Sequence, residues 1–163
     1  MLPPNAPDRP FFLVNPGFLF RKPAARSLLL AWLIVIFWLT LAIFPNPNAE
    51  ANLVPFHSIA RDLSRLDRDF VLNFIGNLAA FLPLGFFLPF ARTARTPLGL
   101  AVAAGIAVSS VIEILQYLSG HRVCDVDDIL LNTVSAAAGH QLAMLWIARE
   151  WKRTARRSLK IRT

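Results

Sequence analysis

Polar side chains that could do chemistry interrupt the apolar stretches of this 163-residue chain. A charged side chain at the middle of a membrane helix costs about 2.5–3.5 kcal/mol, so it is kept only beside polar neighbours or for function. A carboxylate in such a place can serve as a general base, and carboxamides can hold a polar headgroup through hydrogen bonds. The candidates are Asn73, Asn77, Glu113, Gln116, Asp128 and Asn132.

A short loop at residues 120–125 places further charge beside these candidates. Arg122 can pair with Glu113 or with a nearby Asp, and its planar guanidinium also suits bidentate binding of a phosphate. The acids can alternatively hold a divalent cation, for which Mg²⁺ or Ca²⁺ fits oxygen ligands better than Zn²⁺. The ligands of such an ion would be Asp125, Asp127 and Asp128. No motif requires a metal or another cofactor, and a single Cys124 excludes a disulfide framework and a Cys-rich metal site.

The composition indicates which elements must position these residues. The chain is 55% hydrophobic with a mean hydropathy of +0.50, and its apolar residues form long runs with the charge between them. Soluble domains are less apolar and distribute these residues periodically. The net charge of +7 places basic residues beside the apolar runs rather than on one folded face, which argues against nucleic-acid binding.

The runs predict an all-α polytopic membrane helical bundle with about four transmembrane helices. The first run has 18 residues, which at 1.5 Å per residue cover roughly 27 Å, enough to cross. It could instead be a signal peptide with a cleavage site at 49–51, but its length and distance from the start favour a span. The predicted spans cover residues 27–44, 70–91, 97–119 and 126–148.

The same pattern divides the chain into three parts: a lead at 1–26, a transmembrane domain at 27–148 and a basic tail at 149–163. Between the first two spans, apolar residues recur at helical spacing and predict a short extracytoplasmic amphipathic helix. It either lies at the membrane surface or is a solvated connector packed on its neighbours. The apolar positions are Ile59, Leu63, Leu66 and Phe70.

Basic residues set the expected orientation. With four spans, the lead, the 92–96 loop and the tail lie on one side of the membrane and carry four, two and seven of the 17 Lys and Arg residues. The two loops on the other side, at 45–69 and 120–125, carry only four. The positive-inside rule then places both termini in the cytoplasm of a multi-pass protein of the bacterial inner (plasma) membrane. The basic tail should also attract anionic lipids.

Depth groups the candidate residues. Asn77, Glu113 and Asn132 each lie six or seven residues from the extracytoplasmic end of their spans, roughly 9–11 Å deep. They share helical faces with small residues, so these faces should meet. The network can bind a ligand, or it can simply hold the bundle together. His140 and Gln141 lie in the inner half and are interpreted as satisfied interhelical polar groups.

These residues resemble the VanZ-like family of small bacterial membrane proteins. The resemblance covers about residues 52–145 and includes Asn52-Leu53-Val54-Pro55-Phe56, the Asn73-to-Gly85 stretch, Glu113-x-x-Gln116, Arg122-x-x-Asp125-x-Asp127-Asp128 and Asn132-Thr133. One departure is Ser135, where the family usually has Gly, which argues against very close backbone packing there. The family's namesake is associated with low-level resistance to teicoplanin, so the resemblance implies a role in the cell envelope and in antibiotic resistance.

Three functions remain open. The leading hypothesis is an outward-facing polar pocket that binds the headgroup of a membrane lipid or a lipid-linked cell-wall precursor, without catalysis. A second is an intramembrane hydrolase or transferase acting on an envelope lipid, with Glu113 or Asp128 as general base. A third is a small transporter subunit, which would need oligomers. The proposed ligand-binding residues are Asn73, Asn77, Glu113, Gln116, Arg122, Asp125, Asp128 and Asn132.

Overall fold

The computed structural model describes residues 22–42, 52–65, 68–92, 96–119 and 124–160. This part of the chain is all helical, with one isolated parallel bridge between Asn52 and Asp125. Its helices are α1 (Lys22–Ala42), α2 (His57–Arg65), α3 (Arg68–Ala91), α4 (Leu98–Ser119) and α5 (Val126–Lys160).

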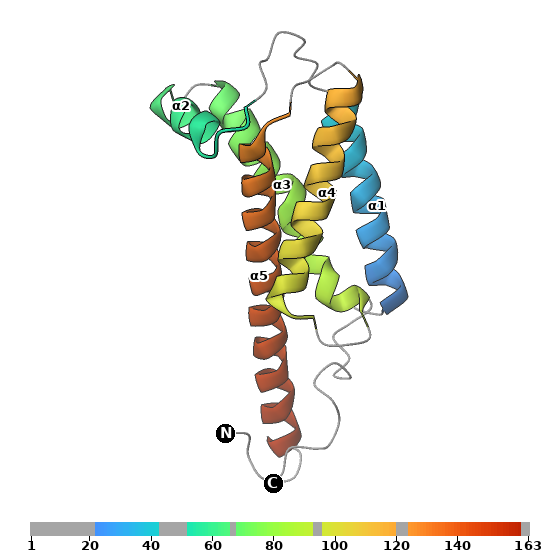
Figure 1. The fold of residues 1–163 in the computed structure, drawn as a ribbon. Helices are drawn as coiled ribbons and strands as arrows, with labels where there is room; N and C mark the ends of the chain where they lie inside the picture. Colours follow the sequence, from blue (N-terminus) through green and yellow to red (C-terminus); the bar gives the residue numbers. More distant parts are fainter. Residues whose placement is uncertain (1–21, 43–51, 66–67, 93–95, 120–123, 161–163) are drawn as a thin grey trace.

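The four long helices form an up-and-down bundle (Figure 1). The short helix α2 lies at the end of the bundle where α4 finishes and where α3 and α5 begin; we call this the α2 end. The start of α1 lies toward the opposite end, and the C-terminal part of α5 projects beyond the other helices there. The predicted polar residues are therefore brought toward the α2 end, away from the basic end of α5.

Two of the described helices are long and apolar enough to cross a membrane. They contain the segments Phe74–Ala91, with a mean hydropathy of 1.8, and Leu98–Leu118, with a mean hydropathy of 2.2. In α1 the apolar stretch Pro23–Leu39 is shorter. Many large apolar side chains on these helices are exposed, including Ile75 and Leu118, as expected for helices that face lipid.

The closest helix contacts are made where glycine brings backbones together. A Cβ at Gly85 of α3 would overlap the carbonyl oxygen of Ala136 in α5, and a Cβ at Gly139 would overlap that of Leu82. On the other side of α5, a Cβ at Gly105 would lie 3.0 Å from the Cα of Thr133. Helix α5 is therefore packed backbone to backbone against α3 and closely against α4.

Ser135 is expected to argue against very close backbone packing at its own position, and its side chain is 2% exposed. The adjacent Ala136 makes the close approach instead, because Gly85 on the facing helix supplies the space.

Helix α1 is held to α3 by apolar packing and by two side-chain hydrogen bonds. Ile36 packs with Phe81 and Leu84 of α3. Trp32 Nε1 donates to the carbonyl oxygen of Ala80 at 2.7 Å, and Arg26 Nε donates to that of Ala91 at 2.9 Å. Ala91 ends α3, so its carbonyl has no partner within the helix and the guanidinium also complements the helix dipole.

The predicted spans correspond to α1, α3, α4 and α5, with differences at their ends. Helix α1 begins at Lys22 rather than at residue 27, and residues 43–44 lie outside the described residues. Helix α5 continues through the basic tail to Lys160, because no helix-breaking residue separates the two. The predicted amphipathic helix is α2, which ends at Arg65; Phe70 belongs to α3 instead.

Candidate functional site

Glu113 is a buried carboxylate at the α2 end of α4. Its side chain is 3% exposed, and Oε2 accepts the backbone N–H of Asp125 at 2.8 Å. Asp125 precedes α5, and its Oδ1 accepts the N–H of Asp127 at 2.9 Å, which makes it the N-cap of that helix. Glu113 thus fixes the start of α5 against the end of α4.

Carboxamides connect the three neighbouring helices at the same end. Asn77 of α3 donates from Nδ2 to Asp128 Oδ1 at 2.8 Å. Asn132, one turn further along α5, donates from Nδ2 to Ser109 Oγ of α4 at 2.8 Å. Asp128, Asn132 and Ser109 are 9%, 4% and 0% exposed. The polar faces predicted for α3, α4 and α5 therefore meet.

Three further predicted residues differ in how far the structure describes them. Gln116 is buried at 3% exposure on the same helix as Glu113. Asn73 lies on α3, but its side chain is not described, and Arg122 lies outside the described residues. The predicted ion pair of Arg122 therefore stays a prediction.

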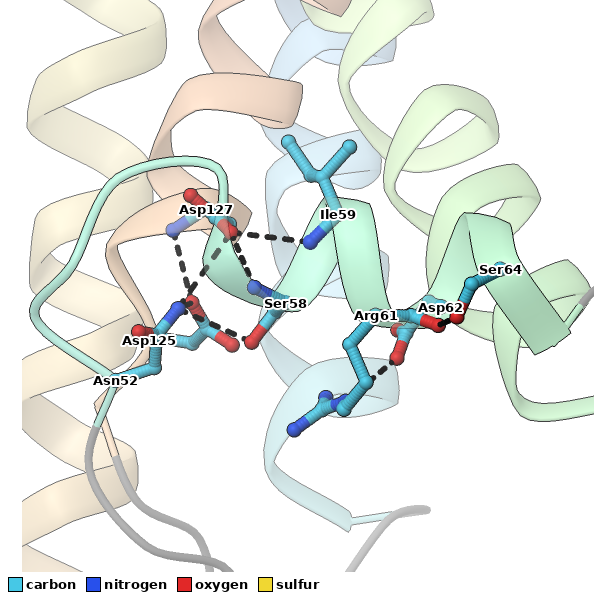
Figure 2. Close-up of polar contacts among 8 residues, drawn as sticks. All are labelled: Asn52, Ser58, Ile59, Arg61, Asp62, Ser64, Asp125 and Asp127. Atoms are coloured by element: carbon cyan, nitrogen blue, oxygen red, sulfur yellow. Dashed lines mark hydrogen bonds and ion pairs between the residues drawn. The ribbon is translucent and has the colours of Figure 1, made fainter.

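Asp127 contacts the start of α2. Its carboxylate lies at the N-terminus of α2 and accepts three backbone N–H groups, of which Figure 2 draws those of Ser58 and Ile59. Oδ1 accepts from Phe56 at 2.6 Å, and Oδ2 accepts from Ser58 at 2.8 Å and Ile59 at 3.1 Å. The side chain is 1% exposed. It therefore caps a helix that lies some 70 residues earlier in the chain. A negative charge is favourable there because the free N–H groups and the dipole of a helix make its N-terminus positive.

Asn52 completes this capping arrangement, which we call the clasp: Asn52, Phe56, Ser58, Asp125 and Asp127. Its backbone accepts from Val126 N and donates to Cys124 O, both at 3.0 Å, and its Nδ2 donates to Asp125 Oδ1 at 2.8 Å and Ser58 Oγ at 3.0 Å. Figure 2 shows the side chains of Asn52, Ser58, Asp125 and Asp127 gathered between the loop before α2 and the start of α5. Phe56 adopts a left-handed conformation with φ of 67°.

The sequence reasoning missed Asn52 as a functional position. Its signal was present, because Asn52 begins the Asn-Leu-Val-Pro-Phe stretch that carries part of the family resemblance. Nothing in residue spacing alone says that this loop pairs with residues 124–126, since the two segments are more than 70 positions apart. Ser109 lies four positions before Glu113 and so shares its helical face, but this spacing alone does not predict the bond of Ser109 to Asn132.

Cys124 lies beside the acidic residues, just before the start of α5. Burial raises the pKa of its thiol, and the negative charges of Glu113, Asp125 and Asp128 raise it further. The thiol is therefore less readily ionised, and less reactive, than a free cysteine.

The described residues contain no cluster of three His, Cys, Asp or Glu side chains arranged to hold a metal ion. Asp127 has both carboxylate oxygens engaged by backbone N–H groups. A divalent ion held by Asp125, Asp127 and Asp128 stays an untested prediction.

At the opposite end of the bundle, His140 is buried at 3% exposure with its Nε2 2.9 Å from the carbonyl oxygen of Thr96. This contact joins α5 to the segment just before α4, so the predicted polar contact is formed at one ring nitrogen. The other ring nitrogen has no hydrogen-bond partner, so the imidazole is only half satisfied. Gln141 is exposed on the bundle surface, so the prediction that it is an interhelical polar group is wrong.

An all-helical bundle with two membrane-length apolar helices and a buried polar cluster at one end is typical of small integral membrane proteins. The family model described as VanZ/LLP1 matches residues 28–147, which include all of the described polar cluster. The chain therefore belongs to the VanZ/LLP1 family. No curated protein and no solved structure matches it.

Proposed function

We propose that α1, α3, α4 and α5 all cross the bacterial inner membrane, with the α2 end outside and both termini in the cytoplasm. The parallel course of the four helices supports this arrangement (Figure 1), as does the basic C-terminal part of α5 at the far end. The helix α2 then lies at the outer surface of the membrane.

Cys124 offers a direct test of this orientation, since it is the chain's one cysteine. In intact cells a small membrane-impermeant thiol reagent, applied at pH 8.5 with a long reaction time, should modify Cys124. A Cys124→Ser variant that carries Lys160→Cys should react only after the membrane is permeabilised. Modification of that double variant in intact cells, with wild-type Cys124 unmodified under the same conditions, would reverse the orientation.

We infer that the polar cluster at the α2 end binds the headgroup of an envelope lipid or of a lipid-linked cell-wall precursor. The observation that carries this proposal is the convergence of buried Glu113, Asp128 and Asn132 from two helices with Asn77 from a third. Holding a bundle together needs no such concentration of acidic groups, because apolar and small residues already pack α3 against α5. A further contact of Arg122 with the headgroup phosphate belongs to the same proposal.

Family membership supports a function in the envelope, and we extend the proposal to antibiotic resistance: headgroup binding would change the sensitivity of the cell to antibiotics that act on envelope precursors. This effect should depend on the same residues as lipid binding. A variant that loses headgroup binding but leaves antibiotic sensitivity unchanged, or the reverse, would show that the two roles are separate.

Photo-crosslinking tests headgroup binding. The full-length protein is placed in nanodiscs with a photoreactive phospholipid or a photoreactive polyprenyl phosphate, and the crosslinked fraction is compared for wild type and Glu113→Gln. The control is Glu150→Gln, which removes a carboxylate that pairs with Arg153 near the C-terminal end of α5. Glu113→Gln should lower crosslinking and alter envelope-antibiotic sensitivity at equal protein level, whereas Glu150→Gln should leave both unchanged. If Glu113→Gln crosslinks like wild type with both probes, the cluster is structural.

The buried carboxylates of Glu113 and Asp128 also favour, as a second candidate, a hydrolase or transferase that acts on an envelope lipid. Incubation of the purified protein with radiolabelled lipid separates the two functions. Conversion of the lipid that Glu113→Gln or Asp128→Asn abolishes would establish the enzyme, and binding without conversion would establish the receptor.

A further inference from the structure

Helix α2 has an apolar flank and a basic flank. Ile59 and Leu63 are four positions apart and so share one flank, whereas Arg61 and Arg65 share another. Each arginine lies two positions, or about 200° of rotation, from an apolar neighbour, so the two flanks lie on nearly opposite sides of the helix. The apolar flank is not covered by the bundle, since Leu63 is 56% exposed.

The side of α2 between these two flanks faces the bundle. Ser58 and Asp62 lie on that side, and both are largely buried where α2 packs on α3 and α5. Figure 1 shows α2 beside the ends of the long helices, near the start of α3. A helix held against the side of a bundle in this way can turn its apolar flank toward the membrane and its basic flank toward the lipid phosphates, which is the arrangement of an interfacial helix.

The loop that leads into α2 is also apolar and exposed. Leu53, Val54 and Phe56 are 71%, 64% and 65% exposed. Phe56 has a φ of 67°, which is rare for a bulky residue, and its N–H donates to Asp127 Oδ1 at 2.6 Å. The clasp therefore holds this residue in a costly backbone conformation without burying its ring in the protein.

Aromatic side chains on two other helices mark the level of the membrane boundary at this end. Trp38 lies near the end of α1 and Tyr117 near the end of α4, and both are 64% exposed. Trp and Tyr gather where lipid headgroups meet acyl chains, because their rings are apolar while their N–H and O–H groups are polar. The α2 end of the bundle is therefore the level at which exposed apolar side chains meet lipid.

We propose that the loop at 53–56 and the apolar flank of α2 form an anchor that is immersed in the outer leaflet, with Arg61 and Arg65 at the level of the lipid phosphates. The partner of this surface is thus a glycerophospholipid layer, and the clasp fixes the depth of the anchor relative to the start of α5. This assignment rests on the proposed membrane arrangement, but it does not require that the polar cluster binds a headgroup.

Depth measurements on single-cysteine variants test the anchor. Full-length protein with Cys124→Ser and either Leu63→Cys or Ser64→Cys is labelled with a nitroxide and placed in vesicles of phosphatidylethanolamine and phosphatidylglycerol. Both positions are exposed but lie on different sides of α2, so they form a matched pair. Electron paramagnetic resonance compares collisions of the label with oxygen, which partitions into the membrane, and with a water-soluble nickel chelate. We expect the Leu63 label about 5–10 Å into the boundary between headgroups and acyl chains, and the Ser64 label in water.

Ile75→Cys is the membrane reference, because Ile75 is exposed on α3 about two turns from its start. If the Leu63 and Ser64 labels are equally open to the nickel chelate, α2 is solvated. If both are shielded from oxygen and from nickel, protein covers α2. Either result overturns the anchor. If the Ile75 label is also open to the chelate, the membrane arrangement fails together with the anchor, whereas an Ile75 label in the bilayer with Leu63 in water refutes the anchor alone.

A second comparison tests the loop. Val54→Ser with Phe56→Ser removes two exposed apolar side chains, whereas Val54→Ile with Phe56→Leu keeps both positions apolar. In the Leu63→Cys background the first pair should move the label toward water, and the second pair should leave its depth unchanged. An unchanged depth in the first pair would overturn the part assigned to the loop. Should that pair fail to fold, a label at Leu53→Cys decides the same point, since it has to lie as deep as the Leu63 label.

Discussion

The α2 end and the middle of the bundle are held together by different forces. In the middle, Gly85 and Gly139 let the backbones of α3 and α5 touch. At the α2 end, the clasp joins segments far apart in sequence through a buried carboxylate and backbone N–H groups. Packing of this kind tolerates no added volume, whereas the clasp depends on charge and hydrogen-bond geometry. The comparison indicates that the two regions should respond differently to substitution.

The largest effect should come from adding volume to the α3–α5 contact. Gly85→Ala and Gly139→Ala would each place a methyl group onto a backbone carbonyl, so we expect a loss of about 3 kcal/mol, the upper part of the range for overpacking. Thermal unfolding in detergent measures this loss. Gly76→Ala is the control, since a Cβ there meets nothing within 4 Å and should stabilise α3 by up to about 1 kcal/mol. Similar melting temperatures for all three variants would mean that the backbones do not touch.

The clasp should fail locally rather than globally. Asp127→Asn turns one acceptor into an NH₂ group facing backbone donors, so we expect a loss of about 2–3 kcal/mol. Hydrogen exchange should become faster at the amides of Ser58 and Ile59 while the α3–α5 contact stays protected. Asp62→Asn, which breaks a surface pair with Arg61, is the control and should cost at most about 1 kcal/mol. Uniform loss of protection along the chain would show that the two regions are one cooperative unit.

A smaller effect is expected where α1 meets the end of α3. Arg26→Met keeps most of the length of the side chain but removes the donor to Ala91 O, so the loss should be about 0.5–1.5 kcal/mol. Chemical denaturation in mixed micelles is sensitive enough to measure it. Lys152→Met on the exposed surface of α5 should change stability by less than about 0.5 kcal/mol. A loss for Lys152→Met as large as for Arg26→Met would assign the effect to charge in general rather than to this bond.

The smallest effect is one of reactivity at the α2 end. Burial and the charges of Glu113, Asp125 and Asp128 raise the pKa of Cys124, so less thiolate is present at a given pH and the rate of reaction with a maleimide should be low near neutrality and climb only at higher pH. Glu113→Gln removes one negative charge, so the pKa falls and the whole rate profile should move to lower pH. Glu150→Gln, at the other end of α5, should leave the profile in place. A profile that moves equally in both variants would argue against direct coupling between Glu113 and Cys124.

Residue patterns predicted the positions of the long helices well, because unbroken apolar runs bounded by charge leave few alternatives. The helical faces of Asn77, Glu113 and Asn132 were predictable for the same reason, since spacing fixes which side chains share a face. The hydrogen-bond partners of the polar side chains were not predictable. That Asp127 would cap α2, or that Asn52 would bridge to Asp125, depends on contacts between segments more than 70 positions apart, and no local periodicity encodes them. The helical extension of α5 into the tail is not predictable from the apolar pattern, because the charged residues there end the apolar run without ending the helix.

The clasp also has a consequence for biosynthesis. The N-terminal cap of α2 is a side chain 71 positions after Phe56, so the segment that receives it emerges from the ribosome well before its partner. At about 5–20 residues per second, roughly 4–14 seconds pass before Asp127 has been translated. During that interval α2 lacks the carboxylate that caps its N-terminus, and Asn52 lacks the backbone bridge to Asp125. The early part of the chain is thus completed by its late part, and a truncated nascent chain that stops before residue 125 would carry an α2 that has yet to acquire its final form.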